Sequence, residues 1–288
     1  MTSLDNAPTT TGGFAPLEAA ARRVREAVIR ATHVASGAHV GGALSQTDLL
    51  VALYHRWLRV RAEEPAWAER DRFVMSKGHG RIGLVATLAD RGFFPADRIA
   101  GYGAEGALCV NMSAVPGVEF ATGSLGHGPG VAVGIALGLR VRRQDARTVC
   151  LISDGELYEG SVWEAIAAAA AFRCGHLTLI VDRNRLTMDG NTEDNVPLEP
   201  IGDRLRAFGW DAVRCDGHDW AALDGALRQA WAVGVSARPL AIVADTVKGC
   251  GVDFMENHPS WHYGSLDSDG LARALASVDR YYAARRGR

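Results

Sequence analysis

The sequence has no excess of charge of either sign, because 31 lysines and arginines stand against 33 aspartates and glutamates among 288 residues. Without a basic field, the protein is not expected to hold nucleic acid or an anionic membrane surface. The longest alanine-rich run, Ala165 to Phe172, is far shorter than the roughly 20 residues that cross a bilayer. No cationic segment followed by an apolar one opens the chain, so we expect a cytoplasmic protein.

Cysteine is scarce, and the five cysteines form no CxxC pair: Cys109, Cys150, Cys174, Cys215 and Cys250. Their odd number and wide spacing argue against a disulfide framework and against a zinc site. The sequence also has no GxSxG motif and no P-loop, which removes the commonest hydrolases and nucleoside triphosphatases. Hydrophobic residues make up 48% of the chain and charged residues 22%, as is typical of a globular protein.

One folded domain is expected over residues 16–288, preceded by a disordered tail at 1–15, because no linker or repeat divides the chain further. Apolar residues at helical spacing predict three helices in the first third of the chain: 16–36, 46–58, and a stretch that starts after Gly80 and ends at Arg91–Gly92. The glycine-bearing segment 37–45, between the first two of these helices, is predicted to be a bend.

From Arg147 onward, short β-branched runs alternate with amphipathic stretches. The runs predict strands and the stretches predict helices: strands over 148–153, 177–182, 210–215 and 239–245, and helices over 159–173 and 219–234. Such alternation indicates an α/β fold with a parallel sheet flanked by helices. Ligands bind such sheets at the carboxyl ends of the strands, so the loops after these strands are expected to carry the chemistry.

Two of those loops carry a side chain that could bind a metal ion. Asp154 follows the first strand of the series and Asn184 follows the second, one crossover unit later. A carboxylate, an amide oxygen and a backbone carbonyl are ligands that suit Mg2+ and leave room for phosphate oxygens. Gly155 would let a phosphate approach the backbone. The alternative is a pair of ordinary turns, since Asp, Asn and Gly all favour turns.

The segments SDGELYEGSVWEA and LIVDRNRLTMDG together resemble the thiamine diphosphate signature. From about residue 17 to about 275, the chain resembles the N-terminal subunit of a split transketolase. The resemblance implies the thiamine-diphosphate-binding fold. Four further segments match in the same order: GAHVGGALS, MSKGHG, VPGVEFATGSLGHG and TVKGCGVDFMENHPSWH.

This resemblance implies two cofactors, thiamine diphosphate and Mg2+. Asp154, Asn184 and the backbone carbonyl of Leu186 would hold Mg2+, and His79 with the backbone at Gly155 would contact the diphosphate. Asp154 and Asn184 thus count both as metal ligands and as cofactor-binding residues.

The resemblance also implies roles at the organic part of the cofactor. Gly123 and Leu125 would contact the aminopyrimidine ring through the backbone. His39 and His262 would point at the reacting end of the thiazolium and touch substrate hydroxyls. Glu159 would belong to a carboxylate network between two active sites of a dimer.

Several positions depart from the family pattern. Where transketolases usually carry a Gly-His-Pro step, this chain has Leu108–Val110, with the thiol of Cys109 in place of a substrate-binding imidazole. This change favours an unusual acceptor, or else it is loop divergence without functional meaning. Ser153 stands in place of glycine and His127 in place of glutamine, and neither change removes a metal ligand.

The second domain of the family, which supplies the glutamate that activates the thiazolium, has no counterpart in these residues. We therefore expect a separate C-terminal subunit, a heterotetramer built on a homodimer, and transfer of a two-carbon ketol unit from a ketose phosphate. Two alternatives stay open. One is a biosynthetic relative that passes the unit to a carrier-bound thiol or another unusual acceptor, and the other is a cofactor-binding subunit without turnover.

Overall fold

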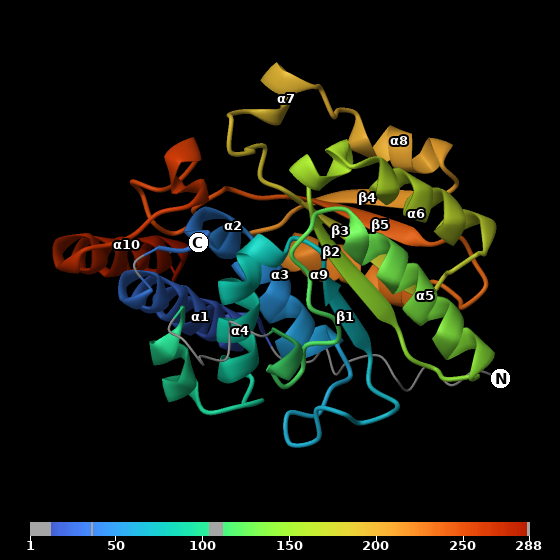
Figure 1. Ribbon diagram of the computed structural model, residues 1–288, viewed down its shortest axis with the longest axis horizontal. Helices are drawn as coiled ribbons and strands as arrows, with labels where there is room; N and C mark the ends of the chain where they lie inside the picture. The colour runs from blue at the N-terminus through green and yellow to red at the C-terminus, as the bar shows by residue number, and fades with distance from the viewer. Residues whose placement is uncertain (1–12, 36, 104–111, 287–288) are drawn as a thin grey trace.

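The computed structural model describes residues 13–35, 37–103 and 112–286, which fold around a five-stranded, wholly parallel sheet (Figure 1). The strand order is β1-β2-β3-β5-β4. Each pair of neighbouring strands runs in the same direction, so every strand ends at the same edge. The strands are β1 (Arg72–Met75), β2 (Thr148–Ser153), β3 (Leu177–Arg183), β4 (Asp211–Asp216) and β5 (Leu240–Asp245).

Helices cover both faces of the sheet (Figure 1). One face carries α5 (His127–Val141), α6 (Gly160–Ala171) and α8 (Ile201–Ala207). The other carries α1 (Ala15–Val34), α3 (Thr47–Ala52), α4 (Arg81–Asp90) and α9 (Trp220–Ala232), with α10 (Ser268–Arg286) packed on α1. The remaining elements are short: α2 (Val40–Ser45), α7 (Thr192–Asn195), the π-helical η2 (Leu53–Trp57), and the 3-10 turns η3 (Gly78–Gly80), η4 (Ala96–Gly101), η5 (Met112–Ala114), η6 (Gly155–Tyr158) and η7 (Pro259–His262).

The apolar strands form a core on each side of the sheet. In β2, Val149 and Leu151 face one core while Cys150 and Ile152 face the other, because successive side chains of a strand point to opposite faces. Burial on both faces accounts for the continuous apolar runs of the sequence. The prediction of a parallel sheet flanked by helices is confirmed.

The predicted strands after Arg147 are all present, with ends shifted by at most one residue. The strand β1 was not predicted, because it has only four residues and pairs with a single neighbour, β2. The predicted helices at 159–173 and 219–234 correspond to α6 and α9.

The N-terminal third differs from prediction in detail. The segment 37–45 is not a simple bend, because Val40–Ser45 forms the helix α2. Gly41 of this helix allows close packing rather than a turn, because an added Cβ there would lie 2.7 Å from the carbonyl oxygen of Trp261. The predicted helix at 46–58 is α3 followed by η2, and α1 begins at Ala15, one residue before the predicted domain boundary. In the part of the chain that the structure describes, no helix is long and apolar enough to cross a membrane.

Candidate functional site

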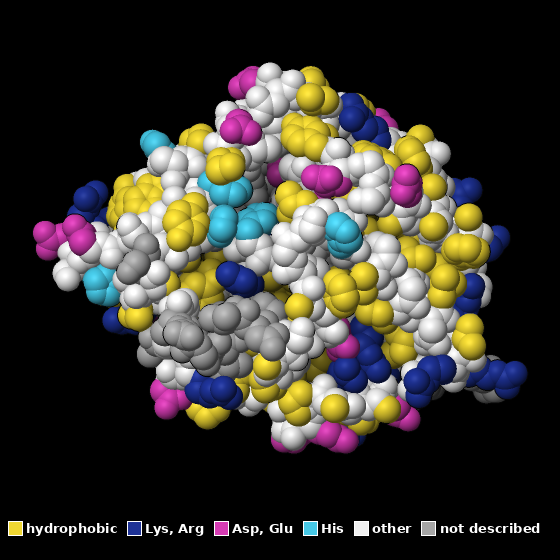
Figure 2. All heavy atoms as spheres, viewed as in Figure 1, with side chains coloured by type: hydrophobic (Ala, Val, Ile, Leu, Met, Phe, Trp, Pro, Cys, Tyr) yellow, Lys and Arg dark blue, Asp and Glu magenta, His cyan; other side chains and the backbone are white. Residues whose placement is uncertain are grey.

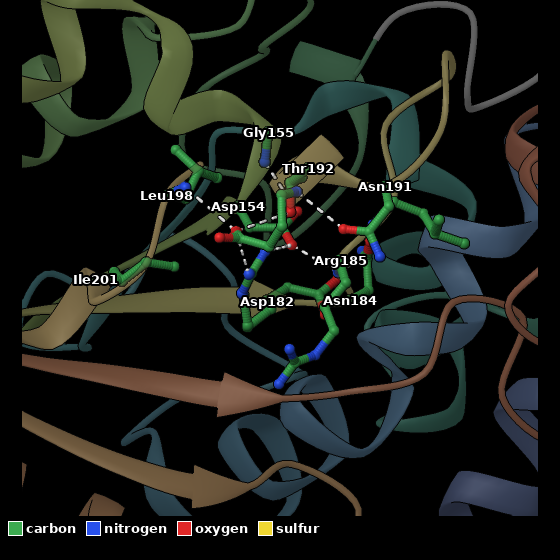
Figure 3. Close-up of polar contacts among 12 residues, drawn as sticks. Asp154, Gly155, Asp182, Asn184, Arg185, Asn191, Thr192, Leu198 and Ile201 are labelled. Carbon is green, nitrogen blue, oxygen red and sulfur yellow. Dashed lines mark hydrogen bonds and ion pairs between the residues drawn. The ribbon is translucent and has the colours of Figure 1, made fainter. Parts of the chain in front are cut away.

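The carboxyl edge of the sheet brings Asp154 and Asn184 together. Ser153, the last residue of β2, pairs in register with Asp182 of β3, so the loops that follow both strands leave the sheet side by side (Figure 3). The Asp154 carboxylate accepts a hydrogen bond of 2.6 Å from the backbone N–H of Arg185. The predicted pair of metal ligands therefore lies on adjacent strand ends.

Asp154 is buried, and its charge is only partly balanced. Arg183 Nη1 lies 2.9 Å from Asp154 Oδ2, and both side chains are almost inaccessible to solvent. Burial, followed by the negative charge of Asp182, raises the pKa of Asp154 above its usual range despite the opposing effect of Arg183. A cation bound at this carboxylate would lower the electrostatic free energy of the site.

The third predicted ligand, the carbonyl oxygen of Leu186, already contacts a cation. Lys248 Nζ donates to it at 2.7 Å and also contacts the carbonyl oxygen of Thr187 at 3.3 Å. Burial and the neighbouring charge of Lys77 lower the pKa of Lys248 to about 8. An ammonium group at this oxygen shows that the loop presents its carbonyls to positive charge.

Asn184 completes the set of oxygen donors. Its Oδ1 accepts from the backbone N–H of Leu186 at 3.1 Å, which holds the amide beside the Leu186 loop. The backbone at Gly155 is close to the same loop, because an added Cβ would lie 3.2 Å from Thr187 Cγ2. The carboxylate, amide and carbonyl oxygens at this edge are the donor types that Mg2+ prefers, so these residues fit the metal.

Three histidines from separate segments meet next to these donors. The ring centroid of His39 lies 5.4 Å from that of His79 and 5.3 Å from that of His262, and the rings of His79 and His262 are stacked at 5.3 Å. The backbone bridge between Ala38 and Gly264 holds two of the segments together. Figure 2 shows the histidines gathered at a hollow on this face of the molecule.

All three rings are neutral at neutral pH. Burial, followed by nearby cations, lowers the pKa of His79 to about 3 and that of His262 to about 4, and it also lowers the pKa of His39. Lys248 joins the histidines to the oxygen donors, since its Nζ lies 3.0 Å from His262 Nδ1 as well as against Leu186. The two groups of predicted residues thus form one site.

Three buried ionic side chains of the site, those of Lys77, Asp182 and Lys248, were not predicted from the sequence. Lys77 forms an ion pair with Asp182, and the Asp182 carboxylate also accepts a hydrogen bond of 2.7 Å from Ser45 Oγ. Lys77 and Lys248 both lie inside segments that carry the family resemblance, MSKGHG and TVKGCGVDFMENHPSWH, in which the resemblance implies roles only for His79 and His262.

Glu156 is a fourth residue of the site that was not predicted, and its carboxylate connects several loops. Its buried carboxylate accepts from the backbone N–H of Gly126 at 2.8 Å and from the hydroxyl of Ser76. It also accepts weakly from the backbone N–H of Ser153 at 3.4 Å. A single acidic side chain therefore joins the end of β2 to the loops that precede α4 and α5.

The loop of Gly123 and Leu125 lies beside the loop of His79. A Cβ added to Gly78 would lie 2.4 Å from the carbonyl oxygen of Thr122, so these two backbones are in close contact. Gly123 itself is exposed, and an added Cβ there meets nothing within 4 Å. The backbone of this loop is therefore open to a ligand.

Glu159 is not part of the histidine cluster. It is exposed and precedes α6, where its Cβ lies near Gly126. Such a position suits contact with another chain better than contact with the three rings. Leu108–Val110, and with them Cys109, lie outside the described residues.

A second polar cluster, around Asp48, His218 and Cys250, has the residue types of a metal site. Arg25 occupies it instead, because its guanidinium donates to both oxygens of Asp48 at 2.8 Å. The same guanidinium donates to the hydroxyl of Tyr282, which links α1 to α10. We interpret this cluster as an ionic anchor between helices.

A parallel sheet with polar loops gathered at the carboxyl ends of its strands defines an α/β ligand-binding domain. The family described as "Transketolase, thiamine diphosphate binding domain" matches residues 18–278, and the chain belongs to this family. The predicted resemblance to a split transketolase subunit is thereby confirmed.

Curated relatives of two lengths match the chain. The 6-deoxy-6-sulfo-D-fructose transketolase subunit SqwG of Clostridium sp. (strain MSTE9) is 37% identical over 84% of this chain and 88% of its own length. A subunit of the apulose-4-phosphate transketolase of Phocaeicola vulgatus is 35% identical over 91% of this chain and 93% of its own. Human transketolase is 36% identical over 91% of this chain but only 42% of its own length.

Solved transketolases share the fold. The crystal structure from Campylobacter jejuni matches with a TM-score of 0.82 at 25% identity, covering 96% of this chain and 48% of that one. The chain thus spans less than half the length of these transketolases. It corresponds to the thiamine-diphosphate-binding part of a family of transferases.

Proposed function

We propose that the protein is the cytoplasmic subunit of a two-component transketolase-like enzyme that binds thiamine diphosphate and Mg2+ and transfers a two-carbon ketol unit from a ketose phosphate to an acceptor. The observation that carries this proposal is the joining, through Lys248, of a histidine cluster to a set of hard oxygen donors at one sheet edge. Thiamine diphosphate supplies a carbanion equivalent for carbon–carbon bond cleavage.

The residues divide into two groups by chemistry. Asp154, Asn184 and the Leu186 carbonyl would hold Mg2+, and His79 with the backbone at Gly155 would face the diphosphate. The backbone at Gly123 and Leu125 would face the aminopyrimidine, in keeping with the open loop found there.

The histidines would handle protons and hydroxyl groups. Because His39 and His262 are neutral, each ring has one nitrogen that can accept a hydrogen bond or a proton and one that can donate. Burial, and then the charge of Lys248 beside it, lower the pKa of His262 and favour its uncharged form. Neutral imidazoles of this kind can orient substrate hydroxyls and exchange protons with them.

A separate C-terminal subunit would supply the activating glutamate. In support, relatives that this chain covers over 88–95% of their length are named as subunits, whereas single-chain transketolases are covered over 42%. We propose a heterotetramer that contains a homodimer of this chain, with Glu159 at the contact between the two sites.

The partner requirement is tested by measuring ketol transfer with Mg2+ and thiamine diphosphate, using this chain alone and together with the partner subunit. Turnover is expected only in the mixture. Full turnover by the isolated chain would contradict the two-component arrangement, and cofactor binding without turnover in the mixture would favour a non-catalytic subunit.

A second candidate function differs in its acceptor: the two-carbon unit would pass to an unusual sugar or to a carrier-bound thiol. The observation in its favour is that the subunit relatives above are named for 6-deoxy-6-sulfo-D-fructose and for apulose-4-phosphate, whereas the single-chain relative is named simply transketolase. Comparing acceptors of both kinds with the complete enzyme distinguishes the two candidates.

The metal site gives the most direct prediction. The variant Asp154→Ala removes the one predicted ligand with a full negative charge, so Mg2+-dependent binding of thiamine diphosphate should weaken by at least about a hundredfold. Titration calorimetry measures the loss. The matched control is Asp189→Ala, an exposed aspartate of the loop after β3 that carries Asn184 and Leu186, which should bind as the parent does. Equal affinities of the Asp154 variant and the parent would contradict the assignment.

A further inference from the structure

The segment that carries Lys248 into the site is held at both ends by side chains of the buried polar cluster described above. The backbone N–H of Val247 donates to His218 Nε2 at 2.9 Å. Three residues later, the carbonyl oxygen of Cys250 accepts from Arg25 Nε at 3.1 Å. Lys248 lies between these two contacts, so the polar cluster determines where the backbone of this lysine runs.

Asp48 connects the two side chains that hold the segment. Its carboxylate accepts from Arg25 Nη1 and Nη2, each at 2.8 Å, and Asp48 Oδ2 lies 2.7 Å from His218 Nδ1. The contact forms because α3, which carries Asp48, packs against α9, and His218 stands in the loop that leads from β4 into α9 (Figure 1). Asp48 is almost inaccessible to solvent, so water does not compete for its hydrogen bonds.

The hydrogen bonds of His218 show where its proton lies. A carboxylate can only accept, so Nδ1 carries the proton that is donated to Asp48. A backbone N–H can only donate, so Nε2 offers its lone pair to Val247. Asp48 thereby selects the one neutral form of the ring that can hold Val247.

A second proton on His218 would occupy Nε2 and remove this acceptor. Burial lowers the pKa of His218, but negative charge at Cys250 and at Asp48 raises it to about 10. The larger of these two effects requires Cys250 to be a thiolate. Cys250 Sγ donates to the hydroxyl of Tyr281 at 3.3 Å, as a thiol does, and the charge of Asp48 is balanced by Arg25. These contacts favour the neutral ring that the hydrogen bonds of His218 require.

Backbone contacts hold the segment at and after Lys248. The carbonyl oxygen of Lys248 accepts from the N–H of Asn257 at 2.9 Å, and the N–H of Gly249 donates to the carbonyl oxygen of Gly41 at 3.0 Å. His218 holds the residue directly before Lys248, so the peptides on both sides of the lysine are fixed. The fixed backbone sets the direction in which the Lys248 side chain leaves the segment.

We propose that His218 is a positioning residue: oriented by Asp48, it keeps Lys248 in place between the oxygen donors and the histidines of the site. The proposal rests on the proposed function. His218 acts only through the peptide of Val247. A displacement of about 1 Å at a catalytic site can lower the rate about a hundredfold, so loss of this contact should reduce turnover.

Two variants of His218 separate its two contacts. In His218→Gln, the amide oxygen takes the place of Nε2 and can still accept from Val247, whereas the shorter side chain of His218→Asn can reach Asp48 but not Val247. In the complete two-component enzyme with saturating cofactor, kcat for ketol transfer should fall at least about tenfold in His218→Asn and stay within about threefold of the parent in His218→Gln. Equal losses in both variants, or no loss in His218→Asn, would overturn the proposal.

The control Tyr282→Phe separates positioning from the stability of the cluster. It removes the hydroxyl that accepts from Arg25 and leaves the contact between His218 and Val247 in place. Urea denaturation should show that Tyr282→Phe is less stable than the parent, while its kcat stays within about threefold. If Tyr282→Phe and His218→Asn lose kcat in proportion to stability, His218 acts only through the stability of the fold and the proposal is wrong.

Nitrogen NMR of the chain alone reads the same contacts without any turnover. At neutral pH, His218 should have a proton on Nδ1 and a hydrogen-bonded lone pair on Nε2, and His262 Nδ1 should report its contact with Lys248 at 3.0 Å. In His218→Asn the signal of His262 Nδ1 should move to the position of a free ring nitrogen, and in His218→Gln it should stay where it is in the parent. Two protons on His218, or an unmoved His262 signal in His218→Asn, would contradict the proposal.

The two sets of measurements separate this proposal from the proposed function. If the NMR contrast between His218→Asn and His218→Gln is found but the complete enzyme transfers no ketol unit, the proposed function fails and the positioning of Lys248 stands. If transfer occurs and both variants match the parent in turnover and in the His262 signal, this proposal fails alone.

Discussion

At the scale of single residues, the site is built from charges that the fold keeps away from water. Lys77 and Asp182 neutralise each other, whereas Lys248 donates to two backbone carbonyls and contacts His262 without forming an ion pair among the described residues. The neighbourhood of the histidines is therefore positive, and positive surroundings favour the neutral form of an imidazole. The same surroundings favour the binding of a ligand that carries phosphate groups.

The lowered histidine pKa values predict how stability depends on pH. In the unfolded chain a histidine takes up a proton near pH 6.5, whereas in the folded chain His79 does so at about 3 and His262 at about 4. The unfolded state binds more protons as the pH falls below 6.5, so stability is greatest above that pH and decreases below it. The loss between pH 7.5 and 5.5 should be about 1 kcal/mol for each ring.

Urea denaturation at these two pH values measures that loss. The variant His79→Gln has no imidazole at this position, and its stability should fall less between pH 7.5 and 5.5 than that of the parent. The control His127→Gln changes an exposed histidine, and its loss should equal that of the parent. If His79→Gln loses as much stability as His127→Gln does, the ring of His79 is not kept neutral by its surroundings.

At the scale of elements, glycines decide how closely the loops of the site can pack. Gly41 lies inside α2 against the segment that carries His262, with 2.7 Å from its added Cβ to the Trp261 carbonyl oxygen. Backbone cannot move aside as a flexible side chain can, so Gly41→Ala should destabilise the fold by about 1–3 kcal/mol. Binding of thiamine diphosphate should weaken as well, because Trp261 precedes His262.

The matched control for Gly41→Ala is a helical glycine with space around it. An added Cβ at Gly225 in α9 meets nothing within 4 Å, so Gly225→Ala should raise stability by up to about 1 kcal/mol through helix propensity. Denaturation midpoints of the two variants measure the contrast. Similar shifts in both would show that α2 and η7 are not in tight contact.

Much of the fold at this scale follows from sequence pattern, for physical reasons. The strands β2, β3 and β5 are apolar runs whose side chains are buried on both faces of the sheet, whereas β4 is an edge strand that alternates partly buried and exposed residues. The strand β1 is too short to give a pattern, and the helix α2 contains glycines whose purpose is visible only once Trp261 is seen against Gly41. A close approach between segments that are far apart in the chain leaves no recognisable pattern in the local sequence.

The candidate site was predictable only in part, for a related reason. The strand ends placed Asp154 and Asn184 at one edge, as the order of the strands requires. Lys248 contacts both the Leu186 carbonyl and His262 because of how the loops around it fold. The hydrophobic periodicity of the sequence does not encode the conformations of loops. The ion pair of Lys77 with Asp182 was missed because buried charges are recognised by their partners, not by their neighbours in sequence.

At the scale of the whole molecule, one face has the features of a contact between chains. The helices α5 and α6 pack on each other on the same side of the sheet, and two large apolar side chains at their ends are exposed, Val141 by 82% and Phe172 by 53%. Added Cβ atoms at Gly130, Gly134 and Gly138, one turn apart along α5, meet nothing within 4 Å. Small residues in a row let another helix approach closely, which agrees with the proposed homodimer.

The variant Gly134→Glu tests whether this face joins two copies of the chain. Among the described residues, an added Cβ at Gly134 meets nothing within 4 Å, so the fold should persist. A carboxylate buried in a contact between two copies of the chain would cost several kcal/mol. Light scattering of the chain mixed with its partner subunit should therefore give half the mass of the parent complex. The control Gly225→Glu makes the same change on α9 and should leave the mass unchanged. An unchanged mass for Gly134→Glu, with circular dichroism showing an intact fold, would place the dimer contact elsewhere.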